Sequence, residues 1–352
     1  MGYQDADDRP HAPLDDARWQ ESDCVWFADW NAGLTGFFRI GQHPAQATGA
    51  VLAYVARSDG PDWRGCFTSE DHARDSHGQR VGAAHAEAVA PRVMRYRWAD
   101  AACSADVTFA DSFYEPRGWA KDASASGLND TINSQGHLEC TGRLTGSVTL
   151  AGEEIVIDAL AHRDRSWGVR PVGSRDPQPI PGHMMPAFFW QWTPLNLEGG
   201  SLFFHINADE NGNPWNTRAA WAADGAGIED IVEGRGTLDS TLAHGTRWPT
   251  GGELALDLPH AGERAPARLT LEPVARFQMK GLGYTHPVWG HGVHHGPLKV
   301  EREDYDLASL DPAQLDNRHV QMLCKVDGDA QGMGVFEQLV LGAYRPLGLE
   351  GI

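Results

Sequence analysis

The chain has 352 residues, a length that suits one large domain or two domains of ordinary size. It carries 48 acidic and 29 basic residues, and its formal charge of −19 argues against a nucleic-acid partner or an anionic membrane surface. The 40 glycines, 21 prolines and 13 tryptophans favour short strands and turns over long helices.

The N-terminal segment, residues 1–20, is polar and acidic and has no apolar stretch of the kind that a secretory signal contains. We therefore expect a flexible N-terminal arm here. No stretch of the chain approaches the roughly 18 apolar residues of a membrane-spanning helix, so we expect no integral membrane segment. The five cysteines are widely spaced without a CxxC pair, which indicates neither a disulfide framework nor a zinc ribbon. The sequence predicts a cytoplasmic protein.

Alternating apolar and polar residues, interrupted by turn signals, follow this segment. The stretches 24–31 (CVWFADWN), 34–42 (LTGFFRIGQ) and 48–60 (TGAVLAYVARSDG) each predict a strand. Residues 92–113 alternate in two runs, and residues 136–168 predict three strands broken by glycine. Only residues 68–90 and 311–319 favour helix, and only through their composition.

The proline-rich stretch 172–186 (VGSRDPQPIPGHMMP) is the candidate domain junction, because the same strand-and-turn pattern resumes after it. The sequence therefore predicts an all-β protein with two similar domains, at residues 21–175 and 176–352. Antiparallel strands joined by short turns are the expected topology.

The stretch 162–170 (HRDRSWGVR) places several ionisable residues directly after an apolar strand. Counting with a period of two puts Asp158, His162 and Asp164 on one face of that strand and Arg163 on the other. A carboxyl group buried among apolar walls holds its proton at neutral pH and can act as a general acid, with His162 as relay. The alternative is a structural ion pair between Asp164 and a neighbouring arginine.

The stretch 136–142 (GHLECTG) places His137 and Glu139 on one strand face. A histidine beside a glutamate can be an oriented base that contacts substrate, although an exposed polar face has the same pattern.

The segment 281–298 (GLGYTHPVWGHGVHHGPL) is rich in aromatic and imidazole groups. It predicts a loop that lines a pocket, with His291 as a further catalytic candidate and with substrate contacts from Tyr284, His286, Trp289 and His295. The alternatives are a metal site that also uses His294, and plain structural packing.

Aromatic runs such as 188–192 (FFWQW) predict a barrel or sandwich core. Their functional interpretation is an apolar pocket, in which Trp167, Trp190 and Trp192 would contact substrate and could stabilise a cationic intermediate.

The motif HRDRSWG at 162–168, the proline-rich break and the second β-rich half together resemble the carotenoid 1,2-hydratase (hydroxyneurosporene synthase) and AttH-like family. That family carries a Tyr-His-Asp-His-Asn-Trp-Gly type motif at a strand end. The stretches 163–170, 283–291 and 332–339 look closest to an uncharacterised branch with an RDRSWG motif. Asp164, Trp167 and Gly168 match the motif, whereas His162, Arg163 and Arg165 replace its tyrosine and two histidines.

The resemblance implies two lipocalin-like antiparallel β-barrels packed side by side, and a cofactor-independent lyase or isomerase of hydratase, dehydratase or cyclase type. It implies an apolar isoprenoid, steroid or aromatic substrate, with Asp164 as the proton donor and no cofactor. The alternatives are a non-catalytic carrier or sensor of hydrophobic ligands, and a metal-dependent enzyme that uses the histidines of 286–295. A homodimer is compatible with all three.

Overall fold

The computed structural model describes residues 5–16, 19–43, 46–55, 63–71, 78–100, 103–115, 133–169, 187–259, 265–284, 286, 288–290, 293 and 295–351. These residues are almost entirely in antiparallel strands. Helix among them is confined to short 3-10 turns: η1 (Asp5–Asp8), η3 (Ile228–Asp230), η4 (Met279–Leu282), η5 (Leu315–Asn317) and η6 (Arg345–Leu347). The described residues thus confirm the predicted all-β class, and the strands form two compact units.

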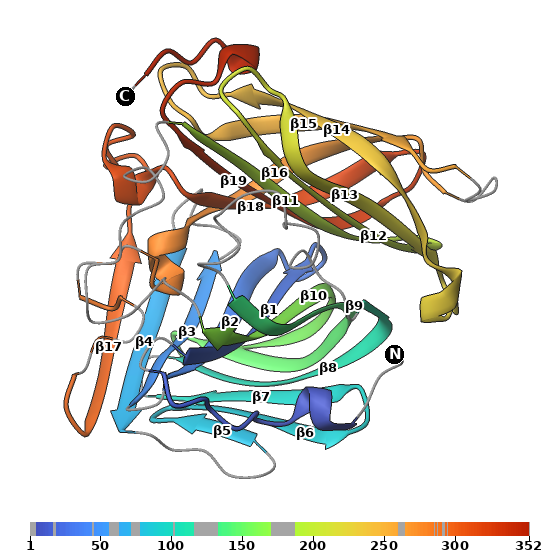
Figure 1. Ribbon diagram of the computed structural model, residues 1–352. Helices are drawn as coiled ribbons and strands as arrows, with labels where there is room; N and C mark the ends of the chain where they lie inside the picture. Colours follow the sequence, from blue (N-terminus) through green and yellow to red (C-terminus); the bar gives the residue numbers. More distant parts are fainter. Residues whose placement is uncertain are drawn as a thin grey trace. The chain divides into compact units, whose positions relative to one another are not determined.

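The first unit is an 11-stranded sheet in the order β17-β4-β3-β2-β1-β10-β9-β8-β7-β6-β5 (Figure 1). Its strands are β1 (Trp19–Asp29), β2 (Leu34–His43), β3 (Gln46–Val55), β4 (Trp63–Asp71), β5 (Gly78–Val81), β6 (Ala84–Ala90), β7 (Val93–Ala99), β8 (Cys103–Glu115), β9 (Asn133–Leu150), β10 (Glu153–Val169) and β17 (Leu298–Tyr305). Residues 68–71, 78–81 and 84–90 are therefore strands, and the helix expected over 68–90 is wrong there. The alternation in 84–90 outweighs the helix preference of its alanines.

The sheet of the first unit curls back on itself. Strand β5 contacts β3 and β4, and the amide of Gly82 in the β5–β6 turn donates a hydrogen bond of 2.8 Å to Oε2 of Glu70 on β4. Thr68 Oγ1 on β4 also donates to the carbonyl of Lys299, at 3.1 Å. The bond from Thr68 lies within the β4–β17 pair, whereas the contacts of β5 with β3 and β4 bring one end of the sheet back toward the other.

Strand β17 comes from the later part of the chain but pairs with β4 of the first unit, in a register that sets Tyr305 opposite Trp63. Residues 281–307 therefore belong to the first unit, although the sequence places them in the domain at 176–352. Sequence order alone gave no sign of this return, because the segment has the same composition as its neighbours.

The second unit is a closed antiparallel barrel of eight strands in the order β11-β12-β13-β14-β15-β16-β18-β19. Its strands are β11 (Phe188–Leu197), β12 (Gly200–Ala208), β13 (Pro214–Ala223), β14 (Val232–Leu242), β15 (Pro249–Asp257), β16 (Arg268–Gln278), β18 (Val320–Gly328) and β19 (Gly332–Leu341). A closed eight-stranded barrel is lipocalin-like, and closure removes the exposed sheet edges.

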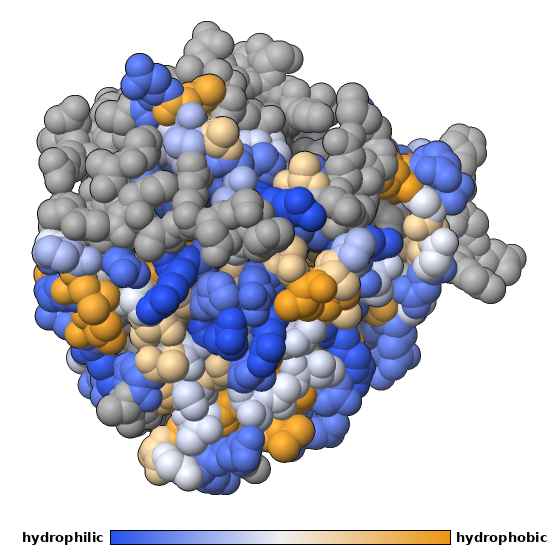
Figure 2. Space-filling model, turned by 90° about the horizontal axis from the view of Figure 1, so that it is seen from below, coloured by the Kyte–Doolittle hydropathy of each residue, from blue (hydrophilic) through white to orange (hydrophobic). Residues whose placement is uncertain are grey.

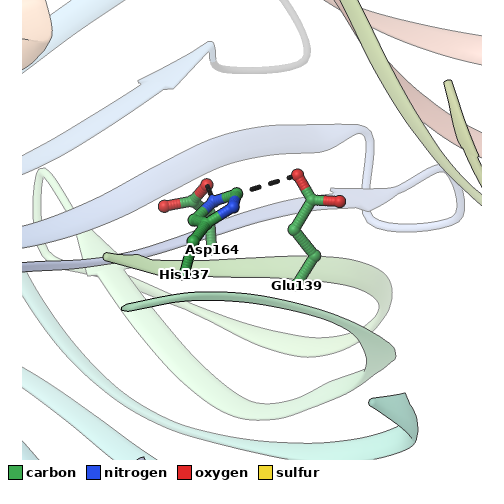
Figure 3. A group of neighbouring side chains, drawn as sticks. All are labelled: His137, Glu139 and Asp164. Atoms are coloured by element: carbon green, nitrogen blue, oxygen red, sulfur yellow. Dashed lines mark hydrogen bonds and ion pairs between the residues drawn. The ribbon is translucent and has the colours of Figure 1, made fainter. Parts of the chain in front are cut away.

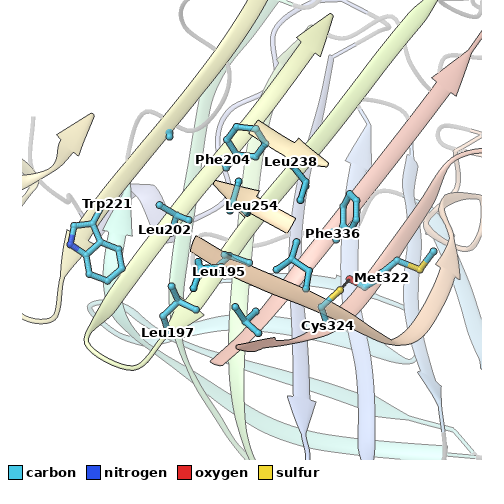
Figure 4. Close-up of a cluster of buried hydrophobic side chains, with 14 of the residues drawn as sticks. Leu195, Leu197, Leu202, Phe204, Trp221, Leu238, Leu254, Met322, Cys324 and Phe336 are labelled. Atoms are coloured by element: carbon cyan, nitrogen blue, oxygen red, sulfur yellow. Dashed lines mark hydrogen bonds between the residues drawn. The ribbon is translucent and has the colours of Figure 1, made fainter. Parts of the chain in front are cut away.

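The interior of this barrel is a close-packed apolar core (Figure 4). Alternate residues of each strand point inward, such as Leu195 and Leu197 on β11, Leu202 and Phe204 on β12, and Phe336 on β19. Each of these side chains is at most 5% exposed. Burial of such side chains contributes about 1.5–3 kcal/mol each, so the barrel core stabilises its own unit.

The turn between β9 and β10 has two central residues, Ala151 and Gly152, both with positive φ (51° and 83°). A two-residue turn with two positive φ angles matches the twist of the flanking strands and fixes their register. It sets Leu150 opposite Glu153 and, without interruption further along, Glu139 opposite Asp164. The hairpin therefore positions the site described below.

The described residues of the N-terminal segment pack on the first sheet. Asp8 is 3% exposed, and Trp19 is fully buried. The sequence predicts a flexible arm over 1–20, whereas residues 5–16 are held by ion pairs and by stacking of the His11 ring on Trp167, with centroids 3.7 Å apart.

None of the helices that the structure describes is long and apolar enough to span a membrane. On the face shown in Figure 2, hydrophobic residues form separate small patches among hydrophilic ones. Scattered apolar side chains of this kind are ordinary on a protein surface.

Candidate active site

Strand β10 separates the charged residues of the HRDRSWG stretch onto two faces. The register with β1 places Arg163 opposite Val25, Asp164 opposite Cys24 and Arg165 opposite Asp23. Because neighbouring side chains of a strand point to opposite faces, Arg163 and Arg165 share one face and Asp164 lies on the other. The alternation predicted from the sequence is therefore present through residue 165.

The two arginines belong to a buried ion network, which we call the arginine network and which comprises Asp8, Glu21, Asp23, Arg163 and Arg165. Arg163 donates to both carboxylate oxygens of Asp23, at 3.1 and 2.7 Å, and to Asp8 at 2.5 Å. Arg165 donates to Glu21 at 2.6 Å and to Asp23 at 3.3 Å. Each of the five residues is at most 3% exposed.

The arginine network explains the positive charges of the stretch. Arg165 also donates to the backbone carbonyls of Asp8 and Arg9, at 2.9 and 2.6 Å, so it fixes the N-terminal segment to the strand. The Arg165 guanidinium and the hydrogen bond from His11 lower the pKa of Glu21, against the effect of its burial. The ion pairs that we describe for Arg163 and Arg165 therefore use carboxylates other than Asp164, and Arg170 lies outside the described residues.

On the opposite face, Asp164 joins His137 and Glu139 of β9 in a group that we call the His137 cluster (Figure 3). His137 Nε2 lies 2.6 Å from Asp164 Oδ2 and 4.0 Å from Glu139 Oε1. Figure 3 shows the imidazole between the two carboxylates. The side chains of His137 and Glu139 are 1% and 3% exposed, whereas that of Asp164 is 16% exposed. Asp164 is thus the most accessible member.

The strand register builds the His137 cluster. Glu139 is directly opposite Asp164, and His137 is opposite Ser166, one diagonal step from Asp164. Diagonal neighbours are within reach of long side chains. The sequence predicts two separate pairs, His137 with Glu139 and His162 with Asp164. It does not predict that Asp164 contacts His137. The two-residue turn at Ala151-Gly152 was the available signal, because counting outward from it pairs the two strands.

His162 lies on the same face, one step further along β10, opposite Thr141 of β9 and Trp26 of β1. Complete burial lowers its pKa from the usual 6.5 to about 3; Asp164 opposes this shift and His137 adds to it. The Trp26 and His162 rings lie 5.9 Å apart. Because His162 is neutral at neutral pH, it carries no imidazolium proton there, and His137 is the imidazole that contacts Asp164.

The His137 cluster can act in two chemical ways. A hydrogen bond of 2.6 Å between an imidazole nitrogen and a carboxylate oxygen requires a proton between them, so the pair can deliver or accept one. The ligand atoms of the three residues also lie within 4.8 Å of one another. One imidazole and two carboxylates are donors that a divalent metal ion accepts.

Trp167 lies on the face of the arginine network, since β1 and β9 place it opposite Glu21 and Gly136. Its ring stacks on His11 and also lies close to Gly136, where an added Cβ would come within 2.1 Å of the ring. The structure therefore does not bring Trp167 together with Asp164, and its contacts are those of a packing residue.

Trp190 and Trp192 belong to the second unit, on the face of β11 opposite the inward-facing Leu195. Trp190 Nε1 donates to Glu337 at 2.8 Å, and Glu337 also contacts His319 Nε2 at 2.7 Å and Gln321 Nε2 at 2.5 Å. Glu337 is thus the centre of a polar group that the sequence did not indicate. Trp190 donates to it, and Trp192 is opposite it in the strand register.

The loop at 281–298 forms a group around Trp289 in the first unit. His286 Nδ1 accepts from the amides of Val288 and Trp289, at 3.0 and 2.7 Å, and its Nε2 donates to Glu303 at 2.8 Å. His295 packs on Trp289 with ring centroids 4.5 Å apart. Both nitrogens of His286 are therefore used in holding the turn, which leaves the predicted metal role without support at this residue.

Of the other predictions in this loop, Tyr284 is partly buried, whereas His291 and His294 lie outside the described residues. The predicted catalytic role of His291 stays a prediction.

A family model matches residues 9–350, almost the whole chain, and describes a family of unknown function (DUF8625). The chain belongs to this family. No curated protein matches the sequence. The fold and the His137 cluster are thus the main guides to what this DUF8625 member does.

Several solved structures are similar to this DUF8625 chain. A candidate AttH protein from Nitrosomonas europaea aligns with a TM-score of 0.59 and 13% identity, over 96% of each chain. Kievitone hydratase from Nectria haematococca has a TM-score of 0.43 and 12% identity, over 91% of this chain and 88% of that one. CghA with Sch210972 has a TM-score of 0.47 and 10% identity, over 92% of this chain and 88% of that one.

The likeness to the AttH protein shows a shared fold across both units, as the sequence resemblance implied. The assignment to carotenoid hydratases and the transfer of their motif to Asp164 stay predictions.

Proposed function

We propose that the protein is a cofactor-independent lyase or isomerase of the hydratase or dehydratase type. The His137–Asp164 pair would supply the proton in this reaction. One observation carries the proposal: a hydrogen bond of 2.6 Å joins a buried imidazole to a carboxylate that keeps 16% of its surface exposed. A proton shared in such a pair is shielded from bulk water, yet one partner remains within reach of a substrate.

The reaction is redox-neutral and needs only proton transfers. In the dehydration direction, the Asp164 side of the pair protonates a leaving hydroxyl, and the C–O bond breaks with loss of water. A carboxylate then takes the proton from the neighbouring carbon, and a double bond forms. Glu139, whose Oε1 is 4.0 Å from His137 Nε2, is the candidate acceptor. Hydration follows the same steps in reverse, and isomerisation omits the water.

This proposal changes the roles drawn from the sequence. His137 replaces His162 as the partner of Asp164, because His162 is fully buried with a pKa of about 3. The face around Asp164 also carries several buried polar residues, such as Ser22, Arg39 and Ser166, so its walls are not purely apolar. Trp26 and Phe37, both at most 3% exposed, supply the apolar part of that face.

The test uses isotope labelling, because the direction and substrate need not be known in advance. A small-molecule extract of the producing cells is incubated with the protein in deuterium oxide and analysed by untargeted mass spectrometry. We expect one or a few compounds to gain deuterium with the wild type and not with Asp164→Asn. General acid–base catalysis contributes about 10²–10⁴-fold, so labelling in the variant should fall by that order.

Asp158→Asn is the matched control, because Asp158 lies on the same strand face but its side chain is 60% exposed and paired with Arg143. It should label as the wild type does. Equal labelling by Asp164→Asn and the wild type would remove Asp164 from the mechanism. A bound apolar ligand that is never altered would instead favour the carrier or sensor.

A metal-dependent lyase is the second candidate, since the three ligand atoms of the His137 cluster lie within 4.8 Å. A divalent ion held there would polarise a substrate oxygen. Elemental analysis of the purified wild type and of Glu139→Gln separates the two mechanisms. Stoichiometric metal that is lost in the variant favours the second, and equal background metal in both proteins favours the first.

A further inference from the structure

A row of side chains crosses four neighbouring strands of the first sheet through the His137 cluster. The registers place Arg39 of β2 opposite Cys24 of β1, Cys24 opposite Asp164, and Asp164 opposite Glu139. Directly opposed residues of an antiparallel sheet point to the same face. Arg39 is therefore on the face of Asp164, two strands away, and it is 3% exposed.

The guanidinium of Arg39 lies above Gly41, two residues further along β2. A Cβ added at Gly41 would come within 2.6 Å of Arg39 Nη1, which shows how closely the guanidinium covers this glycine. Gly41 is opposite Ser22, Ser22 is opposite Ser166, and Ser166 is opposite His137. The guanidinium and the His137 imidazole thus occupy the two ends of one cross-strand row.

The residues between these ends are small. Ser22 and Ser166 are 6% and 3% exposed, and their hydroxyl oxygens lie 3.3 Å apart. Serine side chains rise less far above a sheet than arginine or histidine side chains do. The row spans three interstrand spacings, roughly 14 Å between the outer backbones. Because the two serines are covered, a ligand would have to displace the groups above them. A ligand across the serines would then contact the guanidinium at one end and the catalytic pair at the other.

We propose that Arg39 binds a carboxylate of the substrate, and that the substrate is an amphipathic acid with an aromatic or isoprenoid body. This inference rests on the proposed function and deepens it. A guanidinium offers five N–H donors in a planar fork that matches a carboxylate. Glu139 and Asp164 at the other end repel the same anion, so the charges orient the substrate. Trp26 and Phe37, opposite each other in the adjacent row, provide the surface for its apolar body.

The test compares two probes that share an isoprenoid skeleton, retinoic acid and retinol, by quenching of tryptophan fluorescence. Hydrogen bonds to charged groups contribute about 1.5–3 kcal/mol, so the wild type should bind retinoic acid about tenfold or more tightly than retinol. Arg39→Gln should bring the two affinities close together and leave retinol binding unchanged. Gly41→Ala should have the same effect, because the new methyl group displaces the guanidinium while its charge is retained.

Arg143→Gln is the matched control, since Arg143 is on the same face but 55% exposed, and it should keep the preference for the acid. Near-ultraviolet circular dichroism checks that each variant folds. Any of three results would overturn the proposal. The wild type could bind the two probes with equal affinity or bind neither, or folded Arg39→Gln and Gly41→Ala could keep the wild-type preference for the acid. Asp164→Asn removes one of the charges that repel the anion, so it should keep or strengthen the preference for the acid, and a failed labelling experiment with a preserved preference would refute only the reaction.

Discussion

Glu139 and Asp164 stand directly opposite each other on neighbouring strands, with the imidazole of His137 between their carboxylates. Like charges directly opposite in a sheet destabilise it, so this arrangement is maintained by a proton or by another positive charge. Under the proposed function, a proton on His137 would fill this role and would be held at a fixed position, as an acid catalyst requires. Under the proposed function, the two opposed carboxylates would serve catalysis at some cost to the stability of the sheet.

Glu139→Gln should show this conflict. Removal of one of the two opposed carboxylates relieves their repulsion, so we expect the free energy of unfolding to stay the same or rise by about 0.2–1 kcal/mol. Label incorporation should fall, because the candidate proton acceptor is lost. Urea unfolding and the labelling assay measure the two effects on one sample. A clear loss of stability would mean that Glu139 makes a structural hydrogen bond that outweighs the repulsion.

His162 should make the protein sensitive to acid. Its pKa is about 3 in the folded chain against an ordinary 6.5, so below about pH 6.5 the unfolded chain takes up a proton that the folded chain does not. Stability that is present above pH 6.5 is then lost as the pH falls toward 3, by about 1.4 kcal/mol per pH unit for this one group. Urea unfolding midpoints between pH 7 and pH 5 measure the slope.

The titration of two other groups, His43 and Asp111, also contributes to the pH dependence of stability. Burial and the Arg39 guanidinium lower the pKa of His43 to about 3, which adds a slope of the same sign. Burial raises the pKa of Asp111 to about 6, which acts in the opposite direction between about pH 4 and pH 6. His162→Gln should therefore flatten the pH dependence without removing it. An unchanged slope in this variant would show that His162 is not buried in its neutral form.

Asp8→Asn should weaken the attachment of the N-terminal segment. Loss of one partner from a buried ion pair costs about 3–5 kcal/mol, and we expect the lower part of that range because Arg163 keeps its two bonds to Asp23. Hydrogen exchange of residues 5–16 should become faster. Asp15→Asn, at an exposed position of the same segment, is the control and should leave exchange unchanged. Equal exchange in both variants would contradict the role given to Asp8.

Gly136→Ala should disturb the packing of Trp167. The added methyl group would come within 2.1 Å of the indole ring, and the stacked His11 ring restricts the movement of the indole. Overpacking of this kind costs about 1–3 kcal/mol. The double variant Gly136→Ala with Trp167→Leu should recover part of that loss, because the smaller side chain makes room. Thermal unfolding of the two single variants and the double variant measures the coupling, and strict additivity would argue against the contact.

The face of each side chain in the HRDRSWG stretch could be predicted from the sequence. The period of two correctly separated Asp164 from Arg163, because the strand stays regular past this point. The partners could not be predicted in the same way. Asp8, Glu21 and Asp23 bind the arginines from segments more than 100 residues away in the chain, and no local pattern marks such a pairing.

The residues that surround the site could not be predicted from the sequence either. In the sequence, Arg39 is a single basic residue within an apolar strand. Only the strand register across β2, β1 and β10 places it in the same cross-strand row as Asp164. The sequence suggests His286 and His295 as possible metal ligands. In the structure, His286 accepts backbone hydrogen bonds in the turn around Trp289, and His295 packs on the Trp289 ring. Side-chain chemistry suggested candidates, and the strand pairing decided which of them meet.

The pairing of β17 with β4 has a consequence for how the chain is made. The first sheet cannot be completed until residue 305 has left the ribosome, although most of its strands are synthesised before residue 170. During that interval the unpaired edge of β4 is open to other chains, and exposed strand edges promote aggregation. The order of synthesis thus makes the early sheet dependent on a late segment, and a chain that stops before β17 would leave β4 as a permanent open edge.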